Sequence, residues 1–226
     1  MDDALFDPSV LSVPGSLRRR HLALMLVDEC MGGRESRTLC FLRRSAAGGG
    51  ELLSYESGSG DEYGLVVEDD DALLWVFDHE CPYSPWGHDD EPQDWPGMLD
   101  GLPERLATHL PEVHGDSPRS ISGCYWHADG GWRRGDPEPA ADDPGPFLSD
   151  PQGARWLLGP LLDAAGEGVS GLVVEYYERP DRAGAAAELV AHVDAGEPVS
   201  ERELEALAPH DGVATMLARA KELGLA

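Results

Sequence analysis

The fold is decided by residues 62–77, which read EYGLVVEDDDALLWVF. Two apolar runs flank the acidic triplet 69–71, and a polar triplet between apolar runs is typical of a turn. The second run, residues 72–77, is apolar almost throughout, which indicates a strand that is covered on both faces. The stretch therefore predicts an antiparallel hairpin whose second strand lies in the centre of a sheet.

Shorter strand patterns surround this hairpin. Strands are predicted at residues 38–43, 52–55, 120–127 and 132–134, and residues 17–27 fit either a strand or a short helix. Apolar residues between positions 98 and 110 recur every three or four residues, which predicts a helix, and Asp94 has the position of its cap. The first 146 residues are therefore expected to be rich in strands.

The chain after residue 146 has helical patterns. Ser149 with Gln152, and Ser200 with Glu203, have the spacing of capping boxes at helix starts. Helices are predicted at residues 183–193 and 213–223, and residues 172–177 fit either a strand or a helix. Strands that come first and helices that come later predict an α+β fold, with a mostly antiparallel sheet in the N-terminal half and a helical C-terminal half packed on or beside it.

A linker or long loop separates the two halves. Residues 135–146 are rich in Pro, Asp and Ala, as interdomain connections often are. We therefore expect a strand-rich α+β region at residues 1–146 and a mainly helical region at 147–226, either as two domains or as parts of one.

Charge is the strongest compositional signal, because the 226 residues carry a formal net charge of −26. Residues 61–150 hold 22 acids and only 4 bases, a net of −18. Such a field repels nucleic-acid phosphates and anionic membranes, and it attracts a basic protein. The N-terminus lacks the positive charge of a secretory signal, and the longest apolar run is far too short for a membrane span, so we expect a cytoplasmic protein without nucleic-acid or membrane partners.

Motifs for catalysis and cofactor binding are lacking in the sequence. It has no G-x-S-x-G elbow, no G-x-G-x-x-G after a strand, and a single lysine, Lys221, far from the Gly48–Gly50 run. A P-loop is thereby excluded and Schiff-base chemistry is disfavoured. We expect no cofactor and no catalytic residues, so a protein-binding role is favoured over an enzymatic one.

One cluster of metal-ligating residue types follows the predicted central strand. His79, Cys81 and His88 are candidate ligands, and His79 and Cys81 share a face if the strand continues through them. Cys124 and His127 fit poorly as further ligands, since residues three apart on a strand point to opposite faces. The spacing favours a hydrogen-bonded strand end with a core cysteine, and a metal site remains the alternative.

The loop that follows has the composition of a partner-binding surface, because aromatic anchors stand among acids. Its candidate partner-binding residues are Tyr83, Trp86, Asp89, Asp90, Glu91, Asp94 and Trp95. The alternative is that these aromatic side chains belong to the core at the sheet edge.

In acidic composition and in the order of its elements, the chain resembles bacterial immunity proteins. The resemblance implies an antitoxin-like module that neutralises or scaffolds a basic protein partner. Two alternatives remain open. One is a metal-dependent enzyme or metal-stabilised fold that uses His79, Cys81 and His88, and the other is a DNA mimic that occupies a nucleic-acid-binding surface.

Overall fold

The computed structural model describes residues 5–32, 40–45, 50–86, 94–111, 119–139, 150–162 and 166–226. The chain forms two compact units. Unit 1 comprises Met1–Pro14 with Arg43–Leu158, and unit 2 comprises Gly15–Leu42 with Gly159–Ala226. The division that the sequence suggests at residue 146 stays a prediction, and the structure adds that an N-terminal segment belongs to the same unit as the C-terminal helices.

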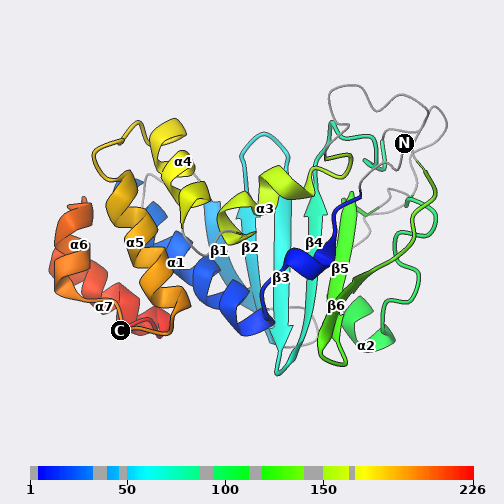
Figure 1. Ribbon diagram of the computed structural model, residues 1–226, viewed down its shortest axis with the longest axis horizontal. Coiled ribbons are helices and arrows are strands. Elements are labelled where there is room, and N and C mark those ends of the chain that lie inside the picture. Colours follow the sequence, from blue (N-terminus) through cyan, green and yellow to red (C-terminus); the bar gives the residue numbers. More distant parts are fainter. Residues whose placement is uncertain are drawn as a thin grey trace. The chain divides into compact units, whose positions relative to one another are not determined.

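The strands form one sheet in which spatial order follows sequence order, β1-β2-β3-β4-β5-β6 (Figure 1). Their bounds are β1 (Cys40–Ser45), β2 (Glu51–Glu56), β3 (Glu62–Glu68), β4 (Asp71–Phe77), β5 (Gly123–Ala128) and β6 (Gly131–Arg134). From β2 to β6, each strand pairs antiparallel with the next. With helices following in the C-terminal half, the sheet confirms the predicted α+β fold.

The hairpin of β3 and β4 forms as predicted. Its register pairs Glu68 with Asp71, so that Asp69 and Asp70 make the turn, and Asp69 adopts a positive φ of 53°. Gly64 lies opposite Trp75, and a Cβ at position 64 would stand 2.4 Å from the indole ring. Glycine at this position is therefore what allows the large indole of Trp75 to lie flat against β3.

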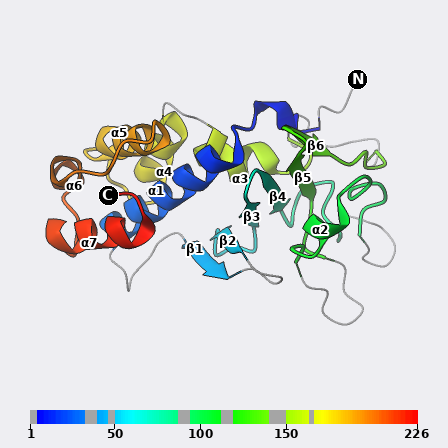
Figure 2. The ribbon, with the colours of Figure 1, turned by 90° about the horizontal axis from the view of Figure 1, so that it is seen from below.

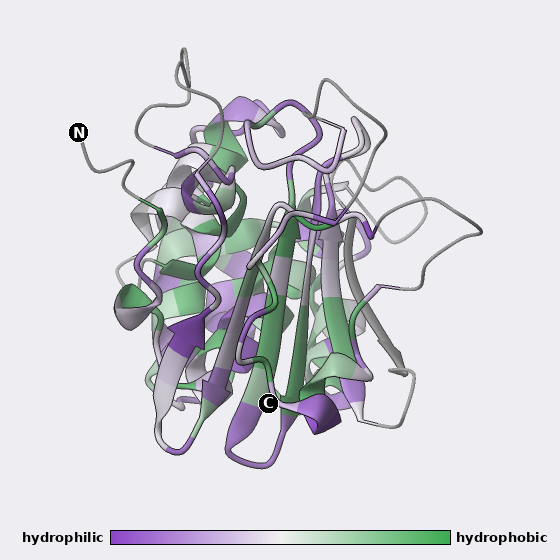
Figure 3. Cartoon of the chain, turned by 90° about the vertical axis from the view of Figure 1, so that its right-hand side faces the viewer, coloured by the Kyte–Doolittle hydropathy of each residue, from purple (hydrophilic) through white to green (hydrophobic). Residues whose placement is uncertain are grey.

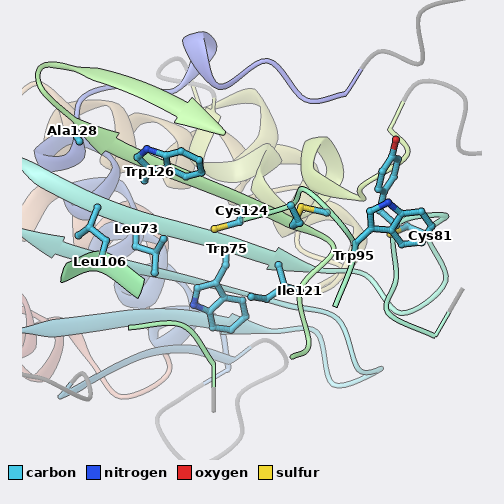
Figure 4. Packing of buried hydrophobic residues seen from close by; sticks show 11 residues of the cluster. Leu73, Trp75, Cys81, Trp95, Leu106, Ile121, Cys124, Trp126 and Ala128 are labelled. Atoms are coloured by element: carbon cyan, nitrogen blue, oxygen red, sulfur yellow. The ribbon is translucent and has the colours of Figure 1, made fainter. Parts of the chain in front are cut away.

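Both faces of β4 are covered, as predicted, because side chains alternate between them. One face places Leu73 and Trp75 beside Cys124 and Trp126 of β5, and the loop segments after Cys81 complete a buried cluster there (Figure 4). The other face carries Leu74 and Tyr125, the latter packed against Phe6 with ring centroids 5.0 Å apart.

Hydropathy follows the same division within the sheet. Figure 3 shows hydrophobic residues along the middle strands and hydrophilic residues at the hairpin turns. Burial of apolar side chains on both faces contributes about 25 cal/mol per Å² of apolar surface removed from water, which makes this sheet the core of unit 1.

The helix predicted from residue 98 to residue 110 does not form over that length. Only a single turn is helical, α2 (Glu104–Ala107), and the residues before it form turns. Gly101 adopts a φ of +82° and Pro103 has no amide hydrogen, so neither continues a helix. Leu106 is nonetheless buried in the core, and Asp94 accepts hydrogen bonds from Arg119 instead of capping a helix.

A short 3₁₀ helix, η1 (Pro8–Val10), precedes the longer helices. These are α1 (Pro14–Gly32), α3 (Ala154–Leu162), α4 (Glu167–Glu175), α5 (Ala183–Asp194), α6 (Glu201–Leu207) and α7 (Val213–Leu223). Two segments that the sequence left undecided between strand and helix are helical, since residues 17–27 lie in α1 and residues 172–175 lie in α4. Figure 2 shows α1 alongside α4, α5 and α7 within unit 2.

Capping explains where two of these helices begin. The predicted box of Ser200 and Glu203 forms at α6, with both reciprocal hydrogen bonds present. At α3, however, the Gln152 side chain is buried and accepts hydrogen bonds from the Phe6 amide and the Tyr125 hydroxyl. Ser149 lies outside the described residues, and it is the Asp150 carboxylate that accepts the backbone N–H of Trp156.

Unit 2 contains buried ion pairs that the pattern of apolar residues in its helices does not predict. Arg20 of α1 donates to Asp194 of α5 at 2.8 Å, and Glu29 of α1 is contacted by the Arg219 guanidinium of α7 at 3.0 Å. Both α1 residues are buried. Buried charges of this kind are tolerated only when they are paired, so the two ion pairs fix the register of α1 against α5 and α7.

Candidate functional site

The chemically richest part of unit 1 lies where β4 ends. We name it the strand-end site, and it comprises Asp61, Asp78, His79, Glu80 and Trp156. β4 stops at Phe77, and Asp78 leads into a turn, so side chains here leave the sheet and meet the loop between β2 and β3. Strand ends are common positions for binding groups because the sheet holds them rigidly while leaving them open to a ligand.

Asp61 brings the β2–β3 loop to this site. Its carboxylate is only 6% exposed and lies with Oδ1 2.6 Å from Nδ1 of His79 and 3.2 Å from the His79 amide. The second oxygen accepts the hydroxyls of Ser57 and Ser59 at 3.2 and 3.1 Å. The serine- and glycine-rich loop is thus ordered around one buried carboxylate, which in turn orients the imidazole ring.

Asp78 is held as firmly from the other side. It is 4% exposed, with Oδ1 accepting the Glu80 amide at 2.9 Å and Oδ2 accepting the indole N–H of Trp156 at 2.8 Å. Gly153 has a φ of +69°, and a Cβ there would stand 2.4 Å from the Asp78 side chain. Glycine at position 153 therefore makes the space in which Asp78 reaches α3.

Two half-exposed tryptophans flank the end of β4. Trp156 is 44% exposed, and Trp86 is 48% exposed with its ring centroid 5.4 Å from that of Phe77. Trp86 contacts Phe77, the last residue of β4, and Trp156 contacts Asp78, the residue directly after it. Large apolar side chains of this kind at a fixed position are the usual anchors of protein interfaces.

Protonation at the site follows from these hydrogen bonds. The hydrogen bond to Asp61 raises the pKa of His79 above its ordinary value of 6.5. Burial would raise the pKa of Asp61, but the hydrogen bonds from His79 and Ser59 lower it below 3.8. The two residues therefore form a charged pair in mildly acidic solution.

The His79 ring is oriented by the Asp61 carboxylate and lies beside Glu80. Its Nδ1 is committed to Asp61, and its Nε2 lies 3.9 Å from the Glu80 carboxylate. The hydroxyls of Ser57 and Ser59 are directed to Asp61. The arrangement supplies carboxylates, an imidazolium and an exposed indole, which are groups that bind cations and polar partners.

The predicted partner-binding residues are not all brought together. Tyr83 and Trp95 are core residues, packed with ring centroids 4.9 Å apart, and the Trp95 indole donates to the Glu138 carbonyl. Trp86 and Asp94 are exposed, although Asp94 is already paired with Arg119 at 2.6 Å. Asp89, Asp90 and Glu91 lie outside the described residues.

The candidate metal ligands of the alternative hypothesis are His79, Cys81 and His88, of which the structure describes the first two. The strand does not continue through His79 and Cys81, because β4 ends at Phe77; His79 is exposed and Cys81 is buried in the core cluster. Burial raises the pKa of Cys81 to about 12, which suppresses the thiolate that a metal requires. His88 lies outside the described residues, and His127 is engaged with the Asp70 carbonyl at 2.7 Å.

A different set of potential ligands comes together instead. Among the described residues, Asp61, Asp78 and His79 each place one ligand atom within 4.8 Å of the others. Sequence reasoning missed Asp61 and Trp156 as site residues. The one sequence signal for Asp61 was its place directly after Ser57-Gly58-Ser59-Gly60, a composition that is typical of a turn.

The acidity is concentrated in the same unit. Unit 1 holds 27 acids and 7 bases, a net of −20, whereas unit 2 holds 16 acids and 10 bases, a net of −6. Three of the unit 1 arginines are already paired with acids, since Arg105 contacts Asp71, Arg119 contacts Asp94 and Arg133 contacts Asp129. The three pairs leave 24 acids and four arginines in this unit.

Comparisons of the chain with protein-family models, with curated proteins and with solved structures found no match. Within the described part of the chain, no helix has both the length and the apolar character that crossing a membrane requires.

Proposed function

We propose that this chain is an acidic protein-binding module of the antitoxin or immunity kind, which engages a basic protein partner through unit 1. The observation that carries the proposal is the exposure of Trp86 and Trp156 at one end of β4, in a unit with a net charge of −20. Net charge of this size steers a basic partner toward the surface, and the aromatic side chains supply the contact energy that charge alone lacks.

The geometry of Trp86 supports its role as an anchor. Its ring lies against the buried ring of Phe77, so a partner finds the indole already positioned. A side chain that is ordered before binding loses less conformational entropy when the interface forms. The acids of the unit need no such ordering, because attraction between charges acts before contact is made.

Two other functions remain hypotheses. A metal-dependent enzyme or metal-stabilised fold has Asp61, Asp78 and His79 in its favour rather than Cys81. Elemental analysis of the purified protein distinguishes it, since we expect far less than one zinc or manganese ion per chain. A DNA-mimic inhibitor predicts competition with duplex DNA for the same partner, which a displacement assay detects.

The proposal is tested with the partner itself. The immobilised chain is used to isolate binding proteins, and each candidate is then purified and its dissociation rate measured directly. We expect a basic protein whose dissociation becomes at least about tenfold faster with Trp86→Ala, because a desolvated anchor is lost. Val13→Ala is the matched control, since Val13 is an exposed apolar residue of the same unit. Equal dissociation rates of the partner from the unaltered chain, Trp86→Ala and Val13→Ala would contradict the proposal.

A further inference from the structure

The strand-end site contains groups that together suit one cationic side chain. Trp156 holds its indole N–H against Asp78 at 2.8 Å, so the ring plane is fixed while 44% of the residue stays exposed. The Glu80 backbone is anchored to the same carboxylate, because the Glu80 amide donates to the other oxygen of Asp78, and the Glu80 side chain is 74% exposed. An aromatic face beside an exposed carboxylate is the combination that attracts a cation.

We propose that this site receives an arginine side chain of the partner, an inference that rests on the proposed function. The guanidinium stacks on the Trp156 ring and donates to the Glu80 carboxylate. Arginine is favoured over lysine because its planar group stacks on an aromatic face and donates two parallel hydrogen bonds to a carboxylate. The hydrogen bond from Trp156 to Asp78 also places negative charge at the edge of the indole, which strengthens its attraction for a cation.

Two of the chain's own bases lie near this position, namely Arg155 and His79, whose Nε2 is 3.9 Å from the Glu80 carboxylate. Arg155 precedes Trp156 on α3, but its guanidinium lies 5.8 Å over the ring of Phe6. The exposed Glu80 carboxylate supplies acceptors for a guanidinium, since an ionised carboxylate has about four acceptor positions, whereas Asp78 is buried and each of its oxygens already accepts one hydrogen bond. A guanidinium therefore adds donors to a site that is rich in acceptors.

The probe is a hexa-arginine peptide, titrated at low salt into the full chain while the indole N–H signals are followed by NMR. A peptide in which citrulline replaces every arginine is the neutral control, and hexalysine tests the choice of cation. We expect a saturable shift of the Trp156 signal with hexa-arginine. Affinity should fall about fivefold to tenfold in Trp156→Leu and in Glu80→Gln, because one stacking contact or one ion pair is lost.

Tyr176→Leu is the matched variant, because Tyr176 is an aromatic residue of similar exposure, 43%, and belongs to unit 2. It should bind the hexa-arginine probe as the unaltered chain does. Hexa-arginine binding that is the same in Trp156→Leu overturns the inference and leaves the proposed function standing, which the partner's dissociation rates test separately. Equal affinity for hexalysine overturns the assignment of arginine, and the absence of saturable binding to either peptide overturns the site altogether.

Discussion

Trp156 donates its indole N–H to the carboxylate of Asp78 at 2.8 Å, and this hydrogen bond fixes the first turn of α3 to the end of β4. Asp78 is buried and Trp156 is half-exposed, so the bond joins the core of unit 1 to its surface. A hydrogen bond to an ionised carboxylate stabilises a fold by about 1.5–3 kcal/mol. The exposed indole is therefore held in place by the same interaction that stabilises the strand end.

Asp78→Asn should lower the free energy of unfolding by about 2 kcal/mol, because the neutral amide replaces a charged acceptor of two hydrogen bonds. The quantity is measured by urea unfolding at neutral pH. Asp100→Asn is the control, since Asp100 lies exposed in a turn of the same unit, and it should change stability by less than about 0.5 kcal/mol. Equal stabilities for the two variants would show that the Asp78 carboxylate has no structural role.

The pair of His79 and Asp61 predicts a specific pH dependence. The pKa of His79 is raised, so its contribution to stability is complete below 6.5 and is lost as the pH rises through the raised value. The pKa of Asp61 is lowered, so its contribution is present above 3.8 and is lost as the pH falls through the lowered value. The pair therefore stabilises unit 1 most between these two ordinary values.

NMR titration of the imidazole signals measures this directly. We expect Asp61→Asn to lower the pKa of His79, while His192, whose pKa is raised by Glu203 in unit 2, stays unchanged. A His79 titration that is the same with and without the Asp61 carboxylate is incompatible with the pair.

The centre of the sheet predicts a large effect of charge. Leu74 is fully buried between Leu65 and Tyr125 on the neighbouring strands. Leu74→Asp should cost several kcal/mol, because it places an unpaired carboxylate where no water reaches it. Thermal unfolding measures the loss, and Val13→Asp, at an exposed position of the same unit, is the control. A Leu74→Asp protein that keeps the parent's melting temperature would place β4 outside the core.

Unit 2 gives an independent test of its buried ion pair. Arg219→Met removes the guanidinium that contacts the buried carboxylate of Glu29 at 3.0 Å. We expect a loss of about 3 kcal/mol, since a buried charge is left without its principal partner. Arg202→Met on α6 is the control, because Arg202 is exposed. Similar denaturant midpoints for both variants would show that the pair contributes nothing to the stability of unit 2.

The sequence predicts those elements whose signals are local. Residues 62–68 and 213–223 form the predicted strand and helix, and Ser200 caps α6 as its spacing indicates. Alternation, helical periodicity and capping need only neighbouring residues, so they are visible without the fold. The prediction of a helix from 98 to 110 was wrong because it used only the spacing of the leucines. Gly101 and Pro103 keep most of this segment in turns, although its apolar residues recur at helical spacing.

The site was less predictable, because its bonds join residues far apart in the chain. Asp61 and His79 are 18 residues apart, and Asp78 and Trp156 are 78 apart. No periodicity reports such contacts. Trp156 has the pattern of a core residue of a helix, yet it is half-exposed and bonded to Asp78. Tyr83 and Trp95, which the sequence leaves open between partner-binding and core positions, lie in the core. The composition predicted which part of the chain is most acidic, but it did not predict which side chains form the strand-end site.

The rate of association with a basic partner tests the central claim most directly. It is measured at ionic strengths of about 0.01 M and 0.15 M, between which the screening length falls from roughly 30 Å to 8 Å. If unit 1 steers the partner, the association rate should fall by about tenfold or more at the higher salt, while the dissociation rate changes far less.

Replacing Asp89, Asp90 and Glu91 by Asn, Asn and Gln should slow association at low salt. The same number of changes in unit 2, Glu188→Gln, Glu197→Gln and Glu205→Gln, should have a clearly smaller effect. An association rate that responds neither to salt nor to the unit 1 substitutions would contradict the account, and the acidity would then serve solubility alone.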